Sequence, residues 1–426
     1  MKILSLMNIP IKILGRLLGT DAEYLLYGSF WFTVAKIVNT VVAFLLSVAY
    51  AHYISKNTYG DYRYILSIFG MLAILSLPGM RNAITRSVAR GFYGTFRKCA
   101  PVVFLFSIGI TVVGACVGLY FFYQENYILG WGMIIASLGM PFVEGLAVWR
   151  AFLHGTKQFK KRAYFNIPSH IFYGVIMLIT ILFIFYLQLD RLHSIVALVS
   201  AYAIGRSLPN IILFLKTYKK IPKDAPCEHG AMKYGFHLSL AAIPTTIAYY
   251  FDGVLLYILL GPASLAVYSF AIAIPEQLKA YVASIAEVAF PKLSEKTHNK
   301  EKIAALKKTL LPKIMKATLF TVLMVIIYII AAPFIYNTFF PKYTDAIIFS
   351  QIFSLSLLFL PLSVLDKEMR AEGNLKYVYL YDSVSPLLQI GILAVLIPFF
   401  GLWGAVTGRV LGRLINYLFL IIIFKR

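Results

Sequence analysis

Apolar residues dominate long stretches of the chain, and short polar segments separate these stretches. Four of them contain 25 or more consecutive uncharged residues, at 99–124, 163–189, 317–341 and 383–408. A helix needs about 20 mostly apolar residues to cross the hydrocarbon core of a membrane. Each stretch therefore predicts a transmembrane helix.

Applied to the whole chain, the same criterion predicts twelve transmembrane helices. Two of them include internal arginines, Arg206 in one and Arg409 with Arg413 in the other. The predicted spans are 27–52, 62–80, 99–123, 128–150, 164–188, 192–215, 234–259, 264–290, 314–336, 345–366, 376–399 and 402–424. The expected fold class is an all-α polytopic membrane protein.

Composition agrees with this class. Hydrophobic residues make up 60% of the chain, charged residues 14%, and the mean hydropathy is +0.78. Soluble proteins have about 45–50% apolar and about 25% charged residues. The composition therefore excludes a soluble enzyme with a large core.

Basic residues are concentrated on one side of the predicted spans. The chain has 40 Lys and Arg against 18 Asp and Glu, a formal net charge of +22. Of the 40, 31 lie on the side that holds the N-terminus, four on the other side and five within spans. Cytoplasmic loops of membrane proteins collect Lys and Arg, so we expect both termini in the cytoplasm. This distribution explains the charge without a nucleic-acid partner.

The two halves of the chain resemble each other at a shift of about 206–207 residues. Tyr62 then overlays Tyr268, and the pair Gly205 and Arg206 overlays Gly412 and Arg413. Six spans per half is an even number, which predicts a parallel repeat related by an axis along the membrane normal. We expect a six-helix lobe with an amphipathic lead-in at 1–220 and a second lobe at 221–426. Short apolar matches also arise by chance, which is the alternative.

The sequence contains no catalytic or metal-binding motif of the common kinds. The three cysteines, Cys99, Cys116 and Cys227, have neither CxxC nor metal-ligand spacing, and GxSxG, HExxH and phosphate-binding glycine loops are missing from the sequence. We therefore expect no enzyme activity, no cofactor and no metal. Any transport would use an ion, voltage or substrate gradient.

Ionisable residues inside predicted spans are the candidate functional groups. Each costs about 2.5–3.5 kcal/mol near the bilayer centre, so it usually faces protein or water and marks a functional site. Lys36 is about ten residues, or about 15 Å, into the first span, and Asn39 shares its helix face. We expect this polar face to line a hydrated cavity.

The seventh and eighth spans have similar polar faces. Tyr249 and Asp252 share one face of the seventh span, and Glu276 and Lys279 share one face of the eighth. We expect these faces to line the same cavity as Lys36. The alternative is structural, because Glu276 and Lys279 are three residues apart and can neutralise each other.

Other charges within spans favour packing roles. Glu144 and Arg206 have similar predicted depths, so we expect them to pair inside the first lobe. Arg409 and Arg413 are one turn apart, and we expect lobe-packing contacts for them. Their candidate partners are Asp382, or Asp366 with Glu368.

Four short segments resemble bacterial Wzx-type flippases of polysaccharide and O-antigen precursors, which belong to the multidrug/oligosaccharidyl-lipid/polysaccharide exporter superfamily. They are Gly28-Ser-Phe-Trp-Phe-Thr with Ala51-His-Tyr-Ile-Ser-Lys-Asn-Thr-Tyr-Gly-Asp-Tyr in the first hairpin, Leu77-Pro-Gly-Met-Arg-Asn-Ala-Ile-Thr-Arg-Ser-Val-Ala, Asp252-Gly-Val-Leu-Leu-Tyr-Ile-Leu-Leu-Gly-Pro-Ala-Ser-Leu-Ala-Val-Tyr-Ser, and Pro291-Lys-Leu-Ser. The resemblance extends over nearly the whole chain.

The resemblance implies a V-shaped pair of six-helix lobes around a cationic central cavity. It implies alternating access that moves an undecaprenyl-diphosphate-linked oligosaccharide across the bacterial inner membrane, with the polyprenyl tail in lipid. Candidate substrate-binding residues are Lys36, Lys279, Asn39 and Tyr249, and candidate ion-coupling residues are Asp252 and Glu276. A polysaccharide polymerase and a chain-length regulator are candidate partners.

Two other functions remain as alternatives. A drug or cation antiporter of the same superfamily would need a net acidic cavity, which Lys36 and Lys279 disfavour. A membrane glycan polymerase or ligase has similar hydropathy, but it would need a sizeable outer loop with catalytic groups. The loops on the side away from the termini are short turns, such as 124–127 and 400–401.

Overall fold

The computed structural model describes residues 22–296, 300–363, 365–366 and 375–425, and within these ranges it contains helices and no strand. The α-helices of the first half are α3 (Ala22–Tyr53), α4 (Lys56–Leu72), α5 (Gly79–Ala89), α6 (Gly94–Tyr123), α7 (Tyr127–Met140), α8 (Trp149–Gly155), α9 (Phe159–Tyr186) and α10 (Arg191–Tyr218). Those of the second half are α11 (Ala231–Ala241), α12 (Ile243–Lys296), α13 (Lys300–Phe339), α14 (Ala346–Ser354) and α16 (Leu375–Lys425). Short 3-10 segments include η1 (Ala73–Ser76) and η5 (Leu355–Leu362).

The helices account for all twelve predicted spans. In the described part of the chain, eight helices are long and apolar enough to cross a membrane, or nine with the bent pair Lys56–Ser76 and Gly79–Ala89. Two of the eight, in α12 and α16, are hairpins, because Gly261 and Gly401 leave the helical region and the chain reverses there. The shorter apolar helix Ala346–Leu362 supplies the remaining span. The all-α prediction is thus confirmed.

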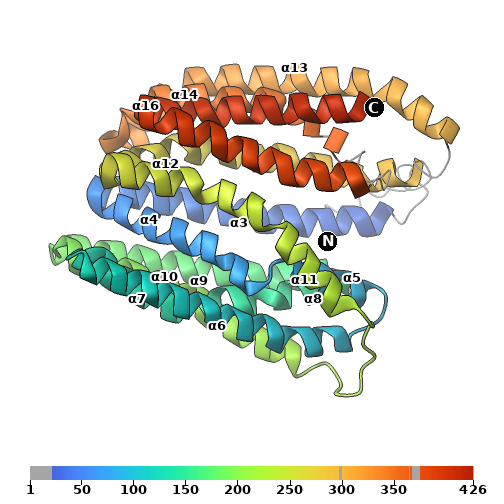
Figure 1. The fold of residues 1–426 in the computed structure, drawn as a ribbon, viewed down its shortest axis with the longest axis horizontal. Helices are drawn as coiled ribbons and strands as arrows, with labels where there is room; N and C mark the ends of the chain where they lie inside the picture. Colours follow the sequence, from blue (N-terminus) through green and yellow to red (C-terminus); the bar gives the residue numbers. More distant parts are fainter. Residues whose placement is uncertain (1–21, 297–299, 364, 367–374, 426) are drawn as a thin grey trace, which may run out of the picture.

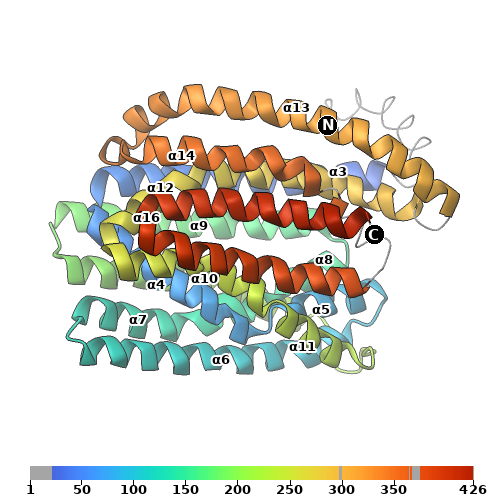
Figure 2. The same cartoon turned by 45° about the horizontal axis from the view of Figure 1, so that its top comes forward.

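The helices form one bundle of roughly parallel rods (Figure 1). In Figures 1 and 2, α6, α7, α9 and α10 lie on one side, α13 and α14 on the other, and α3, α4 and α12 between them. We call the end where α3 begins the proximal end, and the end that holds Gly261 and Gly401 the distal end. The helix α16 ends at the proximal end too, as an even number of spans requires.

The span predicted at 62–80 begins earlier than expected. Ser55 starts α4, because its extended backbone and its hydroxyl, which accepts the Thr58 N–H at 3.1 Å, cap the helix. Arg63 therefore lies well inside the helix rather than near its start. The helix bends by 47° before α5, where Leu77 has a left-handed backbone and Pro78 follows.

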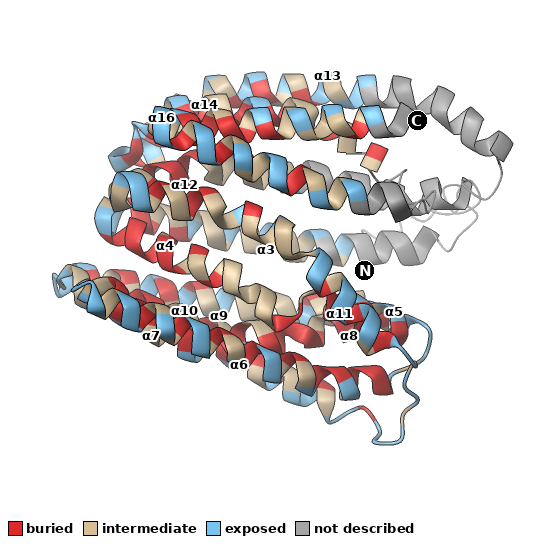
Figure 3. Cartoon of the chain, in the orientation of Figure 1, coloured by how far each residue is buried: buried red, intermediate tan, exposed pale blue. Residues whose placement is uncertain are grey.

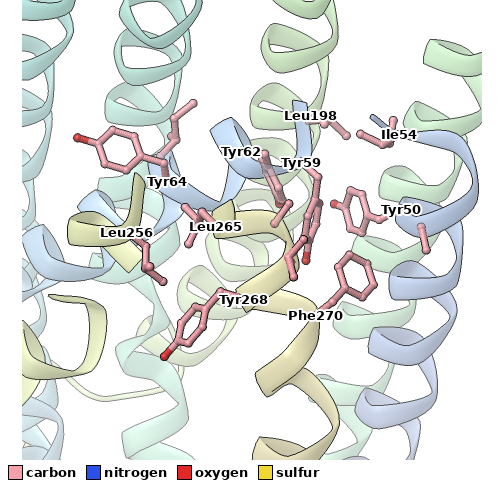
Figure 4. Close-up of a cluster of buried hydrophobic side chains, with 14 of the residues drawn as sticks. Tyr50, Ile54, Tyr59, Tyr62, Tyr64, Leu198, Leu256, Leu265, Tyr268 and Phe270 are labelled. Atoms are coloured by element: carbon pink, nitrogen blue, oxygen red, sulfur yellow. The ribbon is translucent and has the colours of Figure 1, made fainter. Parts of the chain in front are cut away.

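A continuous buried core joins the two halves of the chain (Figures 3 and 4). Tyr59 of α4 contacts Tyr50 of α3 and Phe270 of α12, with ring centroids 4.9 and 5.1 Å apart. Phe270 also stacks on Tyr343, at 3.8 Å. Aromatic pairs in this range add to the free energy of apolar burial, so the aromatic cluster holds the halves together.

Glycine allows the closest contacts between the halves. A Cβ on Gly60 of α4 would lie 1.9 Å from the Pro262 carbonyl oxygen, and one on Gly79 of α5 would lie 2.3 Å from the Ser239 nitrogen of α11. The Gly79 N–H donates to the Ser239 hydroxyl at 3.0 Å. Any larger side chain at either position would push the helices apart.

Candidate functional site

The second half contains a polar cavity of about 210 Å³ inside the helix bundle. Three basic side chains line it, Lys279 from α12 and Arg409 and Arg413 from α16. The other lining residues are Thr245, Ala248, Tyr249, Ser356, Leu357, Leu360, Tyr381, Ser385, Pro386, Gln389, Asn416 and Tyr417. The buried amide oxygen of Asn416 has no hydrogen-bond partner among the described groups. The lining therefore offers cationic and polar groups to a ligand or to water.

Asp252 is buried in an ion pair on one side of this cavity. Its carboxylate accepts a hydrogen bond from Nε of Arg409 at 2.7 Å and another from the Tyr268 hydroxyl. The side chains of Asp252 and Arg409 are only 3% and 7% exposed. Arg409 also donates to the Tyr249 carbonyl oxygen at 2.6 Å. Loss of either partner would be costly, because it would leave the other charge buried without compensation.

Glu276 bridges two other basic groups of the cavity. It pairs with Arg413, and it accepts a hydrogen bond from Lys279 at 3.2 Å. Arg413 also donates to the Ser356 hydroxyl of η5. The expected neutralisation of Glu276 by Lys279 is thus present, with Arg413 as an additional partner. The side chains of Glu276 and Lys279 are 23% and 35% exposed, so this cluster is more open than the Asp252 pair.

The predicted site residues fall into two groups. Tyr249 and Lys279 line the cavity, and Asp252 and Glu276 contact its arginines. Lys36 lies on α3 in the first half, and its ammonium donates to the Ala280 carbonyl oxygen of α12, next to Lys279. Asn39 is half-buried on α3 and is not part of the cavity wall. The structure therefore places Lys36 and Lys279 on adjoining helices.

One expected ion pair, between Glu144 and Arg206, is wrong. Glu144 pairs with Arg81 at 2.7 Å instead of with Arg206, whose guanidinium lies over the Tyr173 ring at 4.1 Å. Equal depth in the membrane was a poor guide, because helix rotation decides which groups meet.

The acid partners expected for Arg409 and Arg413 among the described residues are also wrong. Asp252 and Glu276 of α12 hold these two arginines, in place of Asp382 and Asp366. The third candidate, Glu368, lies outside the described residues. The residues that the sequence analysis assigned only to packing are thus the main cations of the cavity. The sequence analysis identified Asp252 and Glu276 as cavity acids, but the sequence contains no signal that pairs them with these arginines.

Comparisons with known proteins identify the family. A family model described as "polysaccharide biosynthesis protein" matches residues 25–297. The chain belongs to this family. The predicted resemblance is thus confirmed at the level of the family. A curated relative, an uncharacterized membrane protein of Methanocaldococcus jannaschii, is 23% identical, and the match covers 92% of this chain and 82% of the relative.

The fold is similar to those of solved transporter structures. The lipid II flippase MurJ in an inward closed conformation has a TM-score of 0.71 at 15% identity, covering 94% of this chain and 88% of MurJ. An inward-facing multidrug MATE transporter of the MOP superfamily has a TM-score of 0.66 at 14% identity, covering 91% and 93%. At these identities the likeness shows the fold alone.

In this member of the polysaccharide biosynthesis protein family, polar contacts join the halves at the distal end. The sequence analysis did not find them. Lys56 pairs with Asp345 at 2.7 Å, and Lys342 donates to the His52 carbonyl oxygen at 2.6 Å. Each contact joins α3 or α4 to the segment between α13 and α14. The Lys56 ammonium also lies over the ring of Tyr343, which belongs to the aromatic cluster described above.

Proposed function

We propose that this protein flips an undecaprenyl-diphosphate-linked oligosaccharide repeat unit across the membrane during cell-surface polysaccharide biosynthesis. The observation that carries the proposal is the cavity with Lys279, Arg409 and Arg413 in its wall. A diphosphate leaves water only if cationic donors replace its hydration. Family membership and the fold of the flippase MurJ agree with this proposal.

In this proposal Lys36 and Lys279 bind the diphosphate from the two halves. The contact of Lys36 with the carbonyl of Ala280 puts the two lysines on neighbouring helices. Each ammonium has three donors on a flexible stem, which suits a mobile phosphate group. Asn39 and Tyr249 would contact the sugars, and alternating access of the lobes at 1–220 and 221–426 would move the head group.

Asp252 and Glu276 are the proposed ion-coupling groups. Each holds an arginine of the cavity, so protonation of the acid, or cation binding to it, would release that arginine toward the substrate. Ion binding would then be coupled to substrate binding through the net charge of the cavity.

The proposal includes an orientation in the membrane. We infer that the proximal end, with its basic loops, faces the cytoplasm, and that the membrane is the bacterial inner membrane. A polysaccharide polymerase and a chain-length regulator are the proposed partners, and the protein itself would not be an enzyme.

An antiporter of drugs or cations is the second candidate, favoured by the MATE-like fold. It requires acids that are free to bind a cation. Asp252 and Glu276 each have an arginine partner in the structure, which favours an anionic substrate instead.

Charge changes at Lys36 test the proposal. We expect Lys36→Glu to abolish surface polysaccharide in a strain that lacks the chromosomal copy, and Lys36→Arg to retain much of it. Lys98→Glu is the matched control, because Lys98 is an exposed lysine of the first half, at the proximal end of α6. Membrane-inserted protein is quantified in each strain. Normal export from well-expressed Lys36→Glu would reject the proposed substrate site that combines Lys36 with the cavity of the second half.

A further inference from the structure

A second cavity, of about 520 Å³, lies at the proximal end between α3 and the turn that joins α8 to α9. Its wall combines the lysines Lys157, Lys160 and Lys161 with the aromatic residues Trp31, Phe159 and Tyr164. The site is separate from the polar cavity of the second half, with which it shares no lining residue.

The lysines of this cavity contact aromatic rings and an amide. The Lys160 ammonium lies 5.7 Å from the centroid of the Trp31 ring. The Lys161 ammonium donates to Gln158 at 3.1 Å and lies 5.9 Å from the Phe165 centroid. Among the described residues, neither lysine forms an ion pair with a carboxylate. The cavity is therefore a concentrated positive charge beside rings of the kind that lie at membrane interfaces.

The backbone brings the lysines to the cavity. Lys157 has a left-handed conformation, with φ of +57°, directly after the C-terminal turn of α8. This conformation ends α8, because the Lys157 and Gln158 amides donate to the His154 and Leu153 carbonyl oxygens at 3.0 and 3.1 Å. It reverses the chain so that Lys160 and Lys161 follow in the first turn of α9.

An apolar surface continues from the cavity along the membrane. On α9, Ile171, Val175 and Ile179 are 46%, 49% and 61% exposed, and their spacing of four residues forms a ridge. Ile37, Val41 and Leu45 form a matching exposed ridge on α3. The helices touch between the ridges, because a Cβ on Gly174 would lie 2.5 Å from Val42. The two ridges together offer an exposed apolar surface against which acyl chains can pack.

We propose that this cavity binds the phosphate head group of an anionic membrane lipid, whose acyl chains follow the ridges of α3 and α9. Lysines bind the phosphate as point charges, and basic pockets between transmembrane helices are a known mode of lipid head-group recognition. The bound lipid would fix the start of α3 against α9. The site is independent of the transported substrate.

Quenching of Trp31 by brominated lipids tests the site. The full-length protein is reconstituted in phosphatidylcholine vesicles that contain brominated phosphatidylglycerol or, in parallel, brominated phosphatidylcholine. The Trp31 signal is the difference between the wild-type protein and Trp31→Phe. We expect stronger quenching by phosphatidylglycerol. Lys160→Gln with Lys161→Gln should reduce that preference by about tenfold, because each lysine contributes to attraction toward an anionic head group.

Two further variants make the result specific. Lys160→Arg with Lys161→Arg should keep the preference. Lys216→Gln with Lys219→Gln is the matched control, since these exposed lysines at the end of α10 lie outside the cavity and the charge change is the same. Equal quenching by the two brominated lipids, or an equal loss in the control, would overturn the proposal. Increased quenching after deletion of residues 2–20 would assign the cavity to the N-terminal segment of the chain and would also overturn it.

Discussion

Lys56 at the start of α4 and Asp345 before α14 form an ion pair that joins the two halves of the chain at the distal end. The Lys56 ammonium lies 2.7 Å from Oδ2 of Asp345, and the two side chains are 33% and 53% exposed. The ammonium also lies 5.5 Å from the centroid of the Tyr343 ring. Because the pair joins segments that are 289 residues apart, it depends on closure of the halves.

Charge reversal at this pair should favour opening of the distal end. Exposed ion pairs contribute about 0.2–1 kcal/mol, so we expect Lys56→Asp or Asp345→Lys to increase labelling of a cysteine at Ser269 by about twofold to fivefold. Ser269 is buried, and its hydroxyl accepts a hydrogen bond from Arg63 of the first half at 3.3 Å. The measurement uses a chain whose three natural cysteines are serine. The double reversal, Lys56→Asp with Asp345→Lys, should restore wild-type labelling. Failure to restore it would show that the ion pair does not keep the distal end closed.

Loss of the buried acid Asp252 should destabilise the second half. Asp252→Asn leaves the Arg409 guanidinium buried without its carboxylate, which typically costs about 3–5 kcal/mol. We expect a lower thermal midpoint for the protein in detergent. Adding Arg409→Gln should recover part of the loss. If Asp252→Asn unfolds at the wild-type temperature, the ion pair contributes little to stability.

Gradient-dependent transport should require Glu276. Glu276→Gln keeps the Ser356 contact of Arg413 and faces a more open part of the cavity, so we expect a smaller stability loss than for Asp252→Asn. In vesicles, the variant should transport without responding to an imposed proton or sodium gradient. Normal gradient-dependent transport by both Glu276→Gln and Asp252→Asn would show that these acids do not couple an ion.

The sequence was sufficient to predict the helices, because membrane spans are long and uniformly apolar. It was less informative where polar and aromatic residues start a helix. At 56–61 the residues Lys-Asn-Thr-Tyr-Gly-Asp read as a loop, but Ser55 caps a helix here, and Lys56, Gly60 and Asp61 each contact the other half of the chain. Packing against α12 therefore overrides the local pattern.

The sequence was sufficient to predict several residues of the site, but not which acidic and basic groups pair with each other. The polar faces of the seventh and eighth spans identified Asp252, Glu276 and Lys279, since a charge in an apolar helix must face something polar. Their partners, Arg409 and Arg413, are 157 and 137 residues away from the acids they contact. Hydropathy and depth contain no information on how helices rotate against each other, so the partners required coordinates.

The segment that joins the halves should detach from the first half at low pH. Glu228 accepts hydrogen bonds from the Ser87 hydroxyl and, at 2.8 Å, from Arg90, and the Ser87 bond is the main cause that lowers the pKa of Glu228 below 4.5. Because the pKa of Glu228 is lower in the folded than in the unfolded protein, its contact stabilises the folded state at pH values above the unfolded pKa. This stabilisation is lost as the pH falls through the folded pKa.

Hydrogen exchange measures this detachment. We expect exchange of the amides at 219–230, corrected for the intrinsic effect of pH, to increase below pH 4.5 in the wild-type protein. Glu228→Gln should show the faster exchange already at neutral pH and no further change. A wild-type protein without this pH dependence would mean that Glu228 does not hold the segment.

Closure of the distal end should depend on the hydroxyl of Tyr257. The Asp61 side chain is fully buried on α4, where it accepts hydrogen bonds from Arg191 at 2.6 and 2.9 Å within the first half and from the Tyr257 hydroxyl, at 2.6 Å, in the second. Tyr257→Phe removes only the bond between the halves, because the ring can keep its stacking on Tyr64 at 3.9 Å.

A hydrogen bond to a charged group contributes about 1.5–3 kcal/mol, so Tyr257→Phe should increase labelling of the Ser269 cysteine by at least about tenfold while the thermal midpoint changes little. Arg191→Gln should lower the thermal midpoint and change the labelling little. It leaves the buried Asp61 carboxylate without its cation, and both residues belong to the first half. Tyr328→Phe is the matched control, because that hydroxyl bonds Ser350 within the second half. If Tyr328→Phe and Tyr257→Phe increase labelling equally, the effect comes from loss of a buried hydroxyl and not from opening between the halves.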